Sequence, residues 1–221
     1  MGDPHPGPLM AGHFEPLPGG GAAAPLDEVE ISILRSLAVQ LMELIGPGEE
    51  PAEGDDPLAA LFTEGPSEPP SDPALARLFP DAYGGPDEVP DDATHAAAAE
   101  FRRYTENDLR ARKREDALAV VRALDALGPV GGARRTDGSD ATAPEGTVNG
   151  AVLRLKPDES RQWLGALNDL RLAIGTRLEV TDEDESGELL RLPDSDPRKP
   201  MVMAYLWLGG LQESLIETLT A

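Results

Sequence analysis

Two groups of charged and polar side chains have the types and spacing to bind a partner or a ligand. The first is a basic island that comprises Arg102, Arg103, Arg110, Arg112, Lys113 and Arg114. If this segment is helical, Arg103, Arg110 and Arg114 share one face, because residues four and seven apart lie on the same side of an α-helix. Such a ridge can bind a carboxylate-rich protein or phosphates. The partner-binding candidates are Arg102, Arg103, Arg110, Lys113 and Arg114.

An ordinary solvated helix surface would account for the same basic island. Glu106 lies four residues before Arg110, and Asp108 lies four residues before Arg112. This is the spacing of ion pairs along one helix. Runs of charge with such pairings are usually solvated faces, so both interpretations stay open at this point.

The second group interrupts an apolar segment and consists of Asn168, Asp169, Arg171 and Arg177. Asn168 and Arg171 are three residues apart, so they share a helical face. Buried polar groups are usually paired within the fold, because an unpaired group costs about 1–3 kcal/mol. The group is therefore either a structural polar network or a contact for a small molecule.

No residues form a recognisable catalytic or metal site. The chain has no cysteine, and its three histidines, His5, His13 and His95, lack the spacing of a zinc ligand set. Asp182 to Leu189 matches the first half of a calcium-binding loop, but the twelfth position, which needs a carboxylate, holds Pro193. No serine nucleophile or phosphate-loop motif occurs. We therefore predict no catalytic residue, no metal and no cofactor.

Helices must position these groups. Asp27 with Glu30 has the form of a capping box before an apolar helix that ends at Gly46. Asp56-Pro57 and Asp72-Pro73 predict the starts of two short helices. A longer helix can start at Asp91 and Asp92, and it is either continuous or, if Thr105 caps a fresh start, in two pieces that meet near Tyr104. Two apolar helices close the chain, and the last is apolar on every side over residues 201–211, which predicts a central position. The expected helices after the first span residues 58–62, 74–79, 92–127 and 157–178, and the last lies within residues 197–221.

The predicted fold class is all-α, a single helical bundle-like domain over residues 26–221 that follows a disordered N-terminal segment, residues 1–25. Long acidic loops rich in Pro and Gly are expected to be flexible, at residues 46–56, 63–72, 80–92, 128–148 and 179–196. Val152–Leu155 has the pattern of a short strand, although one strand alone cannot form a sheet.

Net charge restricts the classes of partner. With 41 acidic and 19 basic residues the formal charge is −22, so the long-range field repels nucleic acid and anionic membranes. Thirteen acidic residues face one arginine between residues 46 and 96, so much of this charge belongs to loops. We expect a soluble cytoplasmic protein that neither enters a membrane nor binds DNA sequence-specifically by itself.

Several strings resemble the actinobacterial domain-of-unknown-function family numbered twenty-seventeen. They are Leu78-Phe79-Pro80-Asp81-Ala82-Tyr83, Glu100-Phe101-Arg102-Arg103, Trp163-Leu164 with Leu167-Asn168-Asp169-Leu170-Arg171, Gly175-Thr176-Arg177-Leu178, and Trp207-Leu208-Gly209 with Gln212-Glu213-Ser214. The resemblance implies an all-helical cytoplasmic protein, often encoded beside the adaptor of the Clp protease. It also implies a regulatory role, since some members are oxidation-sensing transcriptional regulators of the AosR type. Their sensing uses cysteines, which this chain lacks.

These observations favour a non-enzymatic regulatory protein that acts on transcription through a protein partner such as a sigma factor. Two alternatives stay open. One is a protein that binds a small molecule or a divalent metal through Asn168, Arg171 and Arg177 together with carboxylates from the acidic loop. The other is an accessory of Clp proteolysis, which the resemblance alone suggests.

Overall fold

The computed structural model describes residues 12–46, 64–84, 91–127, 150–180 and 191–220. These residues form five helices and three short strands. Helices dominate, as the apolar periodicity predicts, but the fold is not all-α because the strands form a small antiparallel sheet. The elements are β1 (Glu15–Pro16), β2 (Ala22–Asp27), α1 (Glu28–Ile45), α2 (Pro73–Leu78), α3 (Asp92–Ala126), β3 (Gly150–Leu155), α4 (Pro157–Arg177) and α5 (Lys199–Thr220).

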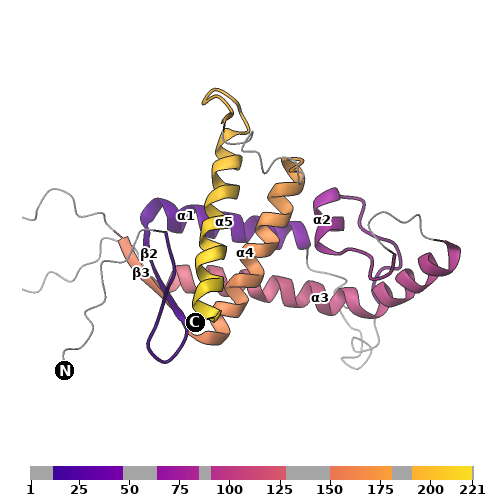
Figure 1. Ribbon diagram of the computed structural model, residues 1–221. Helices are drawn as coiled ribbons and strands as arrows, with labels where there is room; N and C mark the ends of the chain where they lie inside the picture. Colours follow the sequence, from indigo (N-terminus) through magenta and orange to yellow (C-terminus); the bar gives the residue numbers. More distant parts are fainter. Residues whose placement is uncertain (1–11, 47–63, 85–90, 128–149, 181–190, 221) are drawn as a thin grey trace, which may run out of the picture.

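Four long helices form two crossed pairs (Figure 1). α1 and α3 run side by side in opposite directions, and α4 and α5 form a second antiparallel pair that crosses them. α4 is the central element, since it contacts α1, α2, α3 and α5. The sheet lies at one end of this arrangement, and the short α2 lies toward the other end, where it packs on α4.

The predicted helix starts at Asp27 and Asp72 are confirmed. The Asp27 carboxylate accepts from the Glu30 amide at 2.7 Å, and the Glu30 carboxylate accepts from the Asp27 amide at 2.8 Å, which completes a capping box. Asp72 accepts from the amides of Ala74 and Leu75 at 2.8 and 3.1 Å. The short helix predicted over residues 58–62 lies outside the described residues.

α3 is one continuous helix of 35 residues, so the alternative of two pieces meeting near Tyr104 is wrong. Its N-cap is Asp91, which accepts from the Thr94 amide at 2.8 Å. The Thr105 hydroxyl, a candidate cap for a second start, donates instead to the Phe101 carbonyl at 2.8 Å within the helix. This back-bonding lets a threonine stay in a helix interior.

The sheet corrects the prediction for the N-terminal segment. The strand predicted at Val152–Leu155 is confirmed within β3, and its partner is β2, which pairs Ala24 with Leu153. Residues 12–25 are therefore not a disordered tail, because they contain β1 and most of β2. β2 is not recognisable in the sequence, because its three consecutive alanines give no alternation of apolar and polar residues. Its partner strand, β3, lies more than a hundred residues further along the chain.

Two residues of this segment show how closely the strands fit. Gly21 has φ +88°, and a Cβ there would lie 2.2 Å from the Leu155 carbonyl oxygen, so only glycine fits. Pro25 sits in the central strand opposite Val152. Its carbonyl accepts from the Gly12 amide at 3.1 Å, and the nitrogen of a strand residue points to the same side as its carbonyl. The missing N–H therefore costs no hydrogen bond with β3.

The core joins the N-terminal segment to the last two helices. Phe14 is buried and meets the ring of the fully buried Trp163 edge-on, with the ring centroids 6.0 Å apart. Its amide donates to the buried Ser214 hydroxyl on α5 at 3.0 Å. Edge-to-face aromatic pairs add about 0.5–1.5 kcal/mol beyond their buried area, so this contact anchors a segment that the sequence alone does not mark as ordered.

α5 does not take the central position predicted for it. It packs mainly on α4 and touches β1, which buries Val202, Leu208 and Leu211. Met201 and Met203, which belong to the stretch that is apolar on every side, are about half exposed. Of the five predicted loops, the described parts at residues 64–72, 80–84 and 191–196 contain no α-helix or strand.

Candidate functional site

Arg102 in the basic island has partners within the chain. Its side chain is 4% exposed, and its guanidinium donates to the Phe79 carbonyl at 2.8 Å and to the Asp81 carboxylate at 2.9 Å. It also pairs with the Glu106 carboxylate, which is 2% exposed. Arg102 therefore holds the turn that follows α2 against α3.

Arg110 completes this arrangement from one turn further along α3. It donates two hydrogen bonds to Glu106, at 2.7 and 2.9 Å, and one to the Ile45 carbonyl at 2.5 Å. Its guanidinium also lies over the Phe79 ring, 4.4 Å from the centroid. A cation beside the terminal carbonyls of α1 is favourable, because these carbonyls lack helical partners. We refer to Arg102, Glu106 and Arg110 as the charged joint, since it ties α1 and the end of α2 to α3.

Two further members of the basic island also face the protein. Lys113 donates to the buried carboxylate of Asp169 on α4 at 2.6 Å. Arg114 reaches the Met42 carbonyl on α1 at 3.5 Å. The spacing rule correctly pairs Glu106 with Arg110, but it cannot indicate that this pair is buried. A partner-binding role for these residues stays a prediction.

Arg103 differs from its neighbours because it points away from the joint, toward exposed aromatic side chains. It donates to the Tyr104 hydroxyl at 3.0 Å and lies 3.3 Å from the Glu64 carboxylate. Tyr104, Phe101 and Tyr83 are 59%, 45% and 49% exposed. Phe101 and Tyr83 meet edge-on with centroids 5.8 Å apart. We call these three residues the aromatic face. The sequence marks Phe101 and Tyr104 only as single aromatic residues in a charged helix, and it places Tyr83 in a loop.

The four polar candidates on α4 form three separate contacts and not one cluster. Asn168 and Arg171 both bind Gln212 of α5, at 3.4 and 2.6 Å. Asp169 points toward α3 and binds Lys113. Arg177, at the end of the helix, binds the Asp72 carboxylate at 3.1 Å. Each has a structural partner, and whether any of them also binds a ligand stays open.

Two carboxyl groups lie close to each other between α3 and α4. Burial raises the pKa of Asp169 above its usual range, and the bond from Lys113 opposes this shift. Burial also raises the pKa of Asp116, with an added contribution from the charge of Asp169. The helices approach closely here, since a Cβ on Gly165 would lie 2.8 Å from an Asp116 oxygen.

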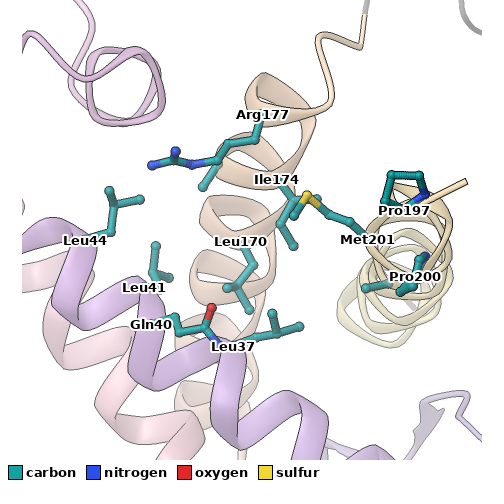
Figure 2. Close-up of a pocket in the computed structure, with 12 residues that line it drawn as sticks. Leu37, Gln40, Leu41, Leu44, Leu170, Ile174, Arg177, Pro197, Pro200 and Met201 are labelled. Carbon is teal, nitrogen blue, oxygen red and sulfur yellow. The ribbon is translucent and has the colours of Figure 1, made fainter.

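An apolar groove of about 540 Å³ lies beside these contacts, between α1, α4 and α5 (Figure 2). Of the twelve described residues that line it, ten are apolar, Gln40 is a neutral amide, and Arg177 is the only charged one. Ligand sites of this size, about 300–1,000 Å³, are commonly apolar with a few polar groups. The lining comprises Leu37, Gln40, Leu41, Leu44, Leu170, Ala173, Ile174, Arg177, Pro197, Pro200, Met201 and Ala204.

Among the described residues, no group of three or more His, Cys, Asp or Glu could hold a metal ion. The loop that partly resembles a calcium site, Asp182 to Leu189, lies outside the described residues.

The sequence also matches a known family. Residues 11–219 match the family described as domain of unknown function (DUF2017). The chain belongs to the DUF2017 family. As a DUF2017 member it is 29% identical over 195 residues to the oxidative stress regulator AosR of Mycobacterium tuberculosis and of Mycobacterium bovis, an alignment that covers 85% of this chain and 77% of either relative. A putative oxidative stress regulator AosR of Mycobacterium leprae is 29% identical over 199 residues, 87% of this chain and 79% of that protein.

No solved structure shows significant similarity to this DUF2017 chain. The relatives are named as regulators and not as enzymes, which is consistent with a regulatory role for the chain. Among the helices that the structure describes, none is long and apolar enough to cross a bilayer.

Proposed function

We propose that this protein is a non-enzymatic regulator that acts by binding a protein partner, and that the aromatic face is part of the surface it uses. The observation that carries the proposal is the gathering of exposed aromatic side chains. The chain has only nine aromatic residues, and Tyr83, Phe101 and Tyr104 are the ones among the described residues that are more than a third exposed.

The composition of this surface supports the proposal. Tyrosine, phenylalanine and arginine are enriched at the centres of protein interfaces, where a few residues, often tyrosine or arginine, contribute most of the binding energy. Arg103 lies beside Tyr104, with its guanidinium 5.1 Å from the ring centroid. The other arginines in this part of α3, Arg102 and Arg110, are already bound within the charged joint.

The relatives support the regulatory part of the proposal, since the proteins it resembles over most of its length are named oxidative stress regulators. The partner we expect is a component of the transcription machinery such as a sigma factor. A response to oxidants in this chain cannot use a thiol, because the sequence contains no cysteine. The net charge of −22 makes direct, sequence-specific DNA binding unfavourable at about 150 mM salt.

The test compares capture by three forms of the tagged full chain in its own cells after brief crosslinking. The wild type should capture a defined partner, and the variant Phe101→Ser with Tyr104→Ser should lose it. The matched control, Met203→Ser with Ile216→Ser, removes two similarly exposed apolar side chains from α5 and should retain it. Circular dichroism verifies that all three forms fold.

Loss of the partner in the control as well, or retention in both variants, would reject the aromatic face. Capture of a component of Clp proteolysis, and not of the transcription machinery, would favour an accessory role in proteolysis over a role in transcription. Purified partner and wild-type protein should then associate directly, and a mobility shift with duplex DNA alone should be negative at the same salt.

A further inference from the structure

We propose that the groove between α1, α4 and α5 binds a medium-chain carboxylate, with the acyl chain along the leucines of α1 and the carboxylate at Arg177. This site is separate from the aromatic face and does not depend on the proposed partner.

The walls of the groove suit a linear apolar chain. Leu37, Leu41 and Leu44 follow one face of α1 and point toward α4 (Figure 2). Ile174 on α4 and Met201 on α5 line the opposite side. Apolar surface removed from water contributes roughly 25 cal/mol per Å². A flexible hydrocarbon can follow such a surface, and the unbranched thioether of Met201 can adapt to it.

The positive charge of Arg177 favours a ligand with a negatively charged head group. Among the described residues Arg177 is the only charged one that lines the groove, and it stands in the last turn of α4. A carboxylate is the anion that the planar guanidinium binds best, through two parallel hydrogen bonds. An alcohol or a cationic head group of the same chain length cannot form this pair.

The guanidinium is available for such a pair. Its described bond runs from one nitrogen, Nη2, to one Asp72 oxygen at 3.1 Å, and the Arg177 side chain is 54% exposed. Asp72 is held independently, because its other oxygen accepts from the Ala74 and Leu75 amides. An exposed ion pair of this kind contributes little to stability. Arg177 can therefore turn toward a ligand while Asp72 continues to cap α2.

The experiment titrates the full chain with octanoate, decanoate and dodecanoate below their micelle concentrations, followed by calorimetry. Affinity should rise with chain length. Dodecanol and dodecyltrimethylammonium carry the same chain without the carboxylate and should bind at least about tenfold more weakly, which is the effect of losing one strong charge-assisted hydrogen bond.

Two variants and one control locate the two ends of the ligand. Arg177→Gln should weaken dodecanoate about tenfold and leave dodecanol unchanged. Ala204→Trp fills the groove from α5 and should abolish binding of both. The control is Arg161→Gln, which removes another exposed arginine of α4 with one ion pair, to Asp158, and should change neither affinity.

Methionine methyl NMR gives a second readout that does not depend on affinity. Met201 lines the groove, whereas Met203 is two residues further along the same helix, is also exposed and does not line it. Dodecanoate should shift the Met201 methyl signal and leave that of Met203 unchanged. The proposal is overturned if no carboxylate binds, if dodecanol binds as tightly as dodecanoate, if Ala204→Trp still binds, or if both methyl signals move together.

Discussion

The charged joint and the apolar groove both involve the C-terminal half of α1, and each differs from what its composition suggests. The joint is rich in arginine and would pass for a solvated surface, yet Arg102 and Glu106 are almost fully buried. The groove is lined by leucine and isoleucine and would pass for core, yet it is open to solvent. Residue type therefore indicates what a surface can bind, while the packing of neighbouring helices decides whether it is free to bind.

The largest effect should come from removing the shared carboxylate of the charged joint. Glu106→Leu leaves the buried Arg102 and the largely buried Arg110 without their common partner. Arg102 keeps its bond to Asp81, but removing one partner from a buried ion pair costs about 3–5 kcal/mol, and urea unfolding should report a loss of this size.

Glu115→Leu is the control for the joint, because Glu115 is exposed on the same helix and pairs with the exposed Arg122. It should cost at most about 1 kcal/mol. Equal losses of unfolding free energy in Glu106→Leu and Glu115→Leu would mean that the charged joint is solvated. The joint and the groove would then no longer differ in burial as described.

A second comparison tests whether the groove is open in solution. Leu34 and Leu37 lie on adjacent turns of α1, but Leu34 is fully buried and Leu37 lines the groove. Leu34→Ala should cost about 2–5 kcal/mol, the usual range for a buried leucine. Leu37→Ala should cost about 1 kcal/mol or less, because one side of this leucine already faces water.

Equal losses at the two leucines, measured by urea unfolding, would show that the groove is closed in solution. It could then not admit a ligand without a structural change.

Local signals in the sequence predict the helices well. The capping residues Asp27, Asp72 and Asp91 are read directly, because a cap and its partner amide lie within three residues of each other. The strand β3 has a recognisable pattern as well. Its partner β2 does not, because strand pairing is a long-range contact and Ala22 to Ala24 carry no alternation.

The candidate site is predicted less well, for the same physical reason. The spacing of Glu106 and Arg110 gives their pairing, but the burial of this pair depends on Phe79, Asp81 and Ile45, which come from elsewhere in the chain. Asn168, Asp169, Arg171 and Arg177 look like one group in sequence. Their positions around α4 direct them to α5, α3 and α2, so only tertiary structure separates them.

A third prediction concerns single arginines of the basic island. Arg110→Ala removes a bond to the Ile45 carbonyl and two bonds to Glu106. Hydrogen bonds to charged groups contribute about 1.5–3 kcal/mol, so the variant should lose stability in that range. If the spacing of Glu106 and Arg110 marked only a solvated helix surface, replacing Arg110 would change stability little.

Arg112→Ala is the matched control, since Arg112 is exposed on the same helix, and it should change stability by less than about 0.5 kcal/mol. Thermal and urea unfolding of both variants measure the difference. If Arg112→Ala is the more costly, the face of α3 that supports the fold has been assigned wrongly.

The smallest effect concerns Asp116, beside Asp169 between α3 and α4. Burial raises its pKa above the ordinary value of 3.8, so the folded protein holds this proton more tightly than the unfolded protein does. The ionised carboxylate therefore costs stability at pH values above the folded pKa, and this cost disappears below about pH 3.8. Asp116→Asn removes the cost and should stabilise the protein at about pH 7, by about 0.5 kcal/mol or less because water screens the site.

The sign of this effect depends on the charges around Asp116. Asp169 and Glu115 disfavour its ionised form, whereas Arg112 and Lys113 favour it. Urea unfolding at about pH 7, 5 and 3.5 should show the gain of Asp116→Asn shrinking as the pH falls. Asp108→Asn removes one exposed negative charge from the same helix and corrects for the relief of general repulsion in a chain of charge −22. If Asp116→Asn instead destabilises the protein at neutral pH, attraction to Arg112 and Lys113 outweighs burial, and the contact between α3 and α4 works as a second charged joint.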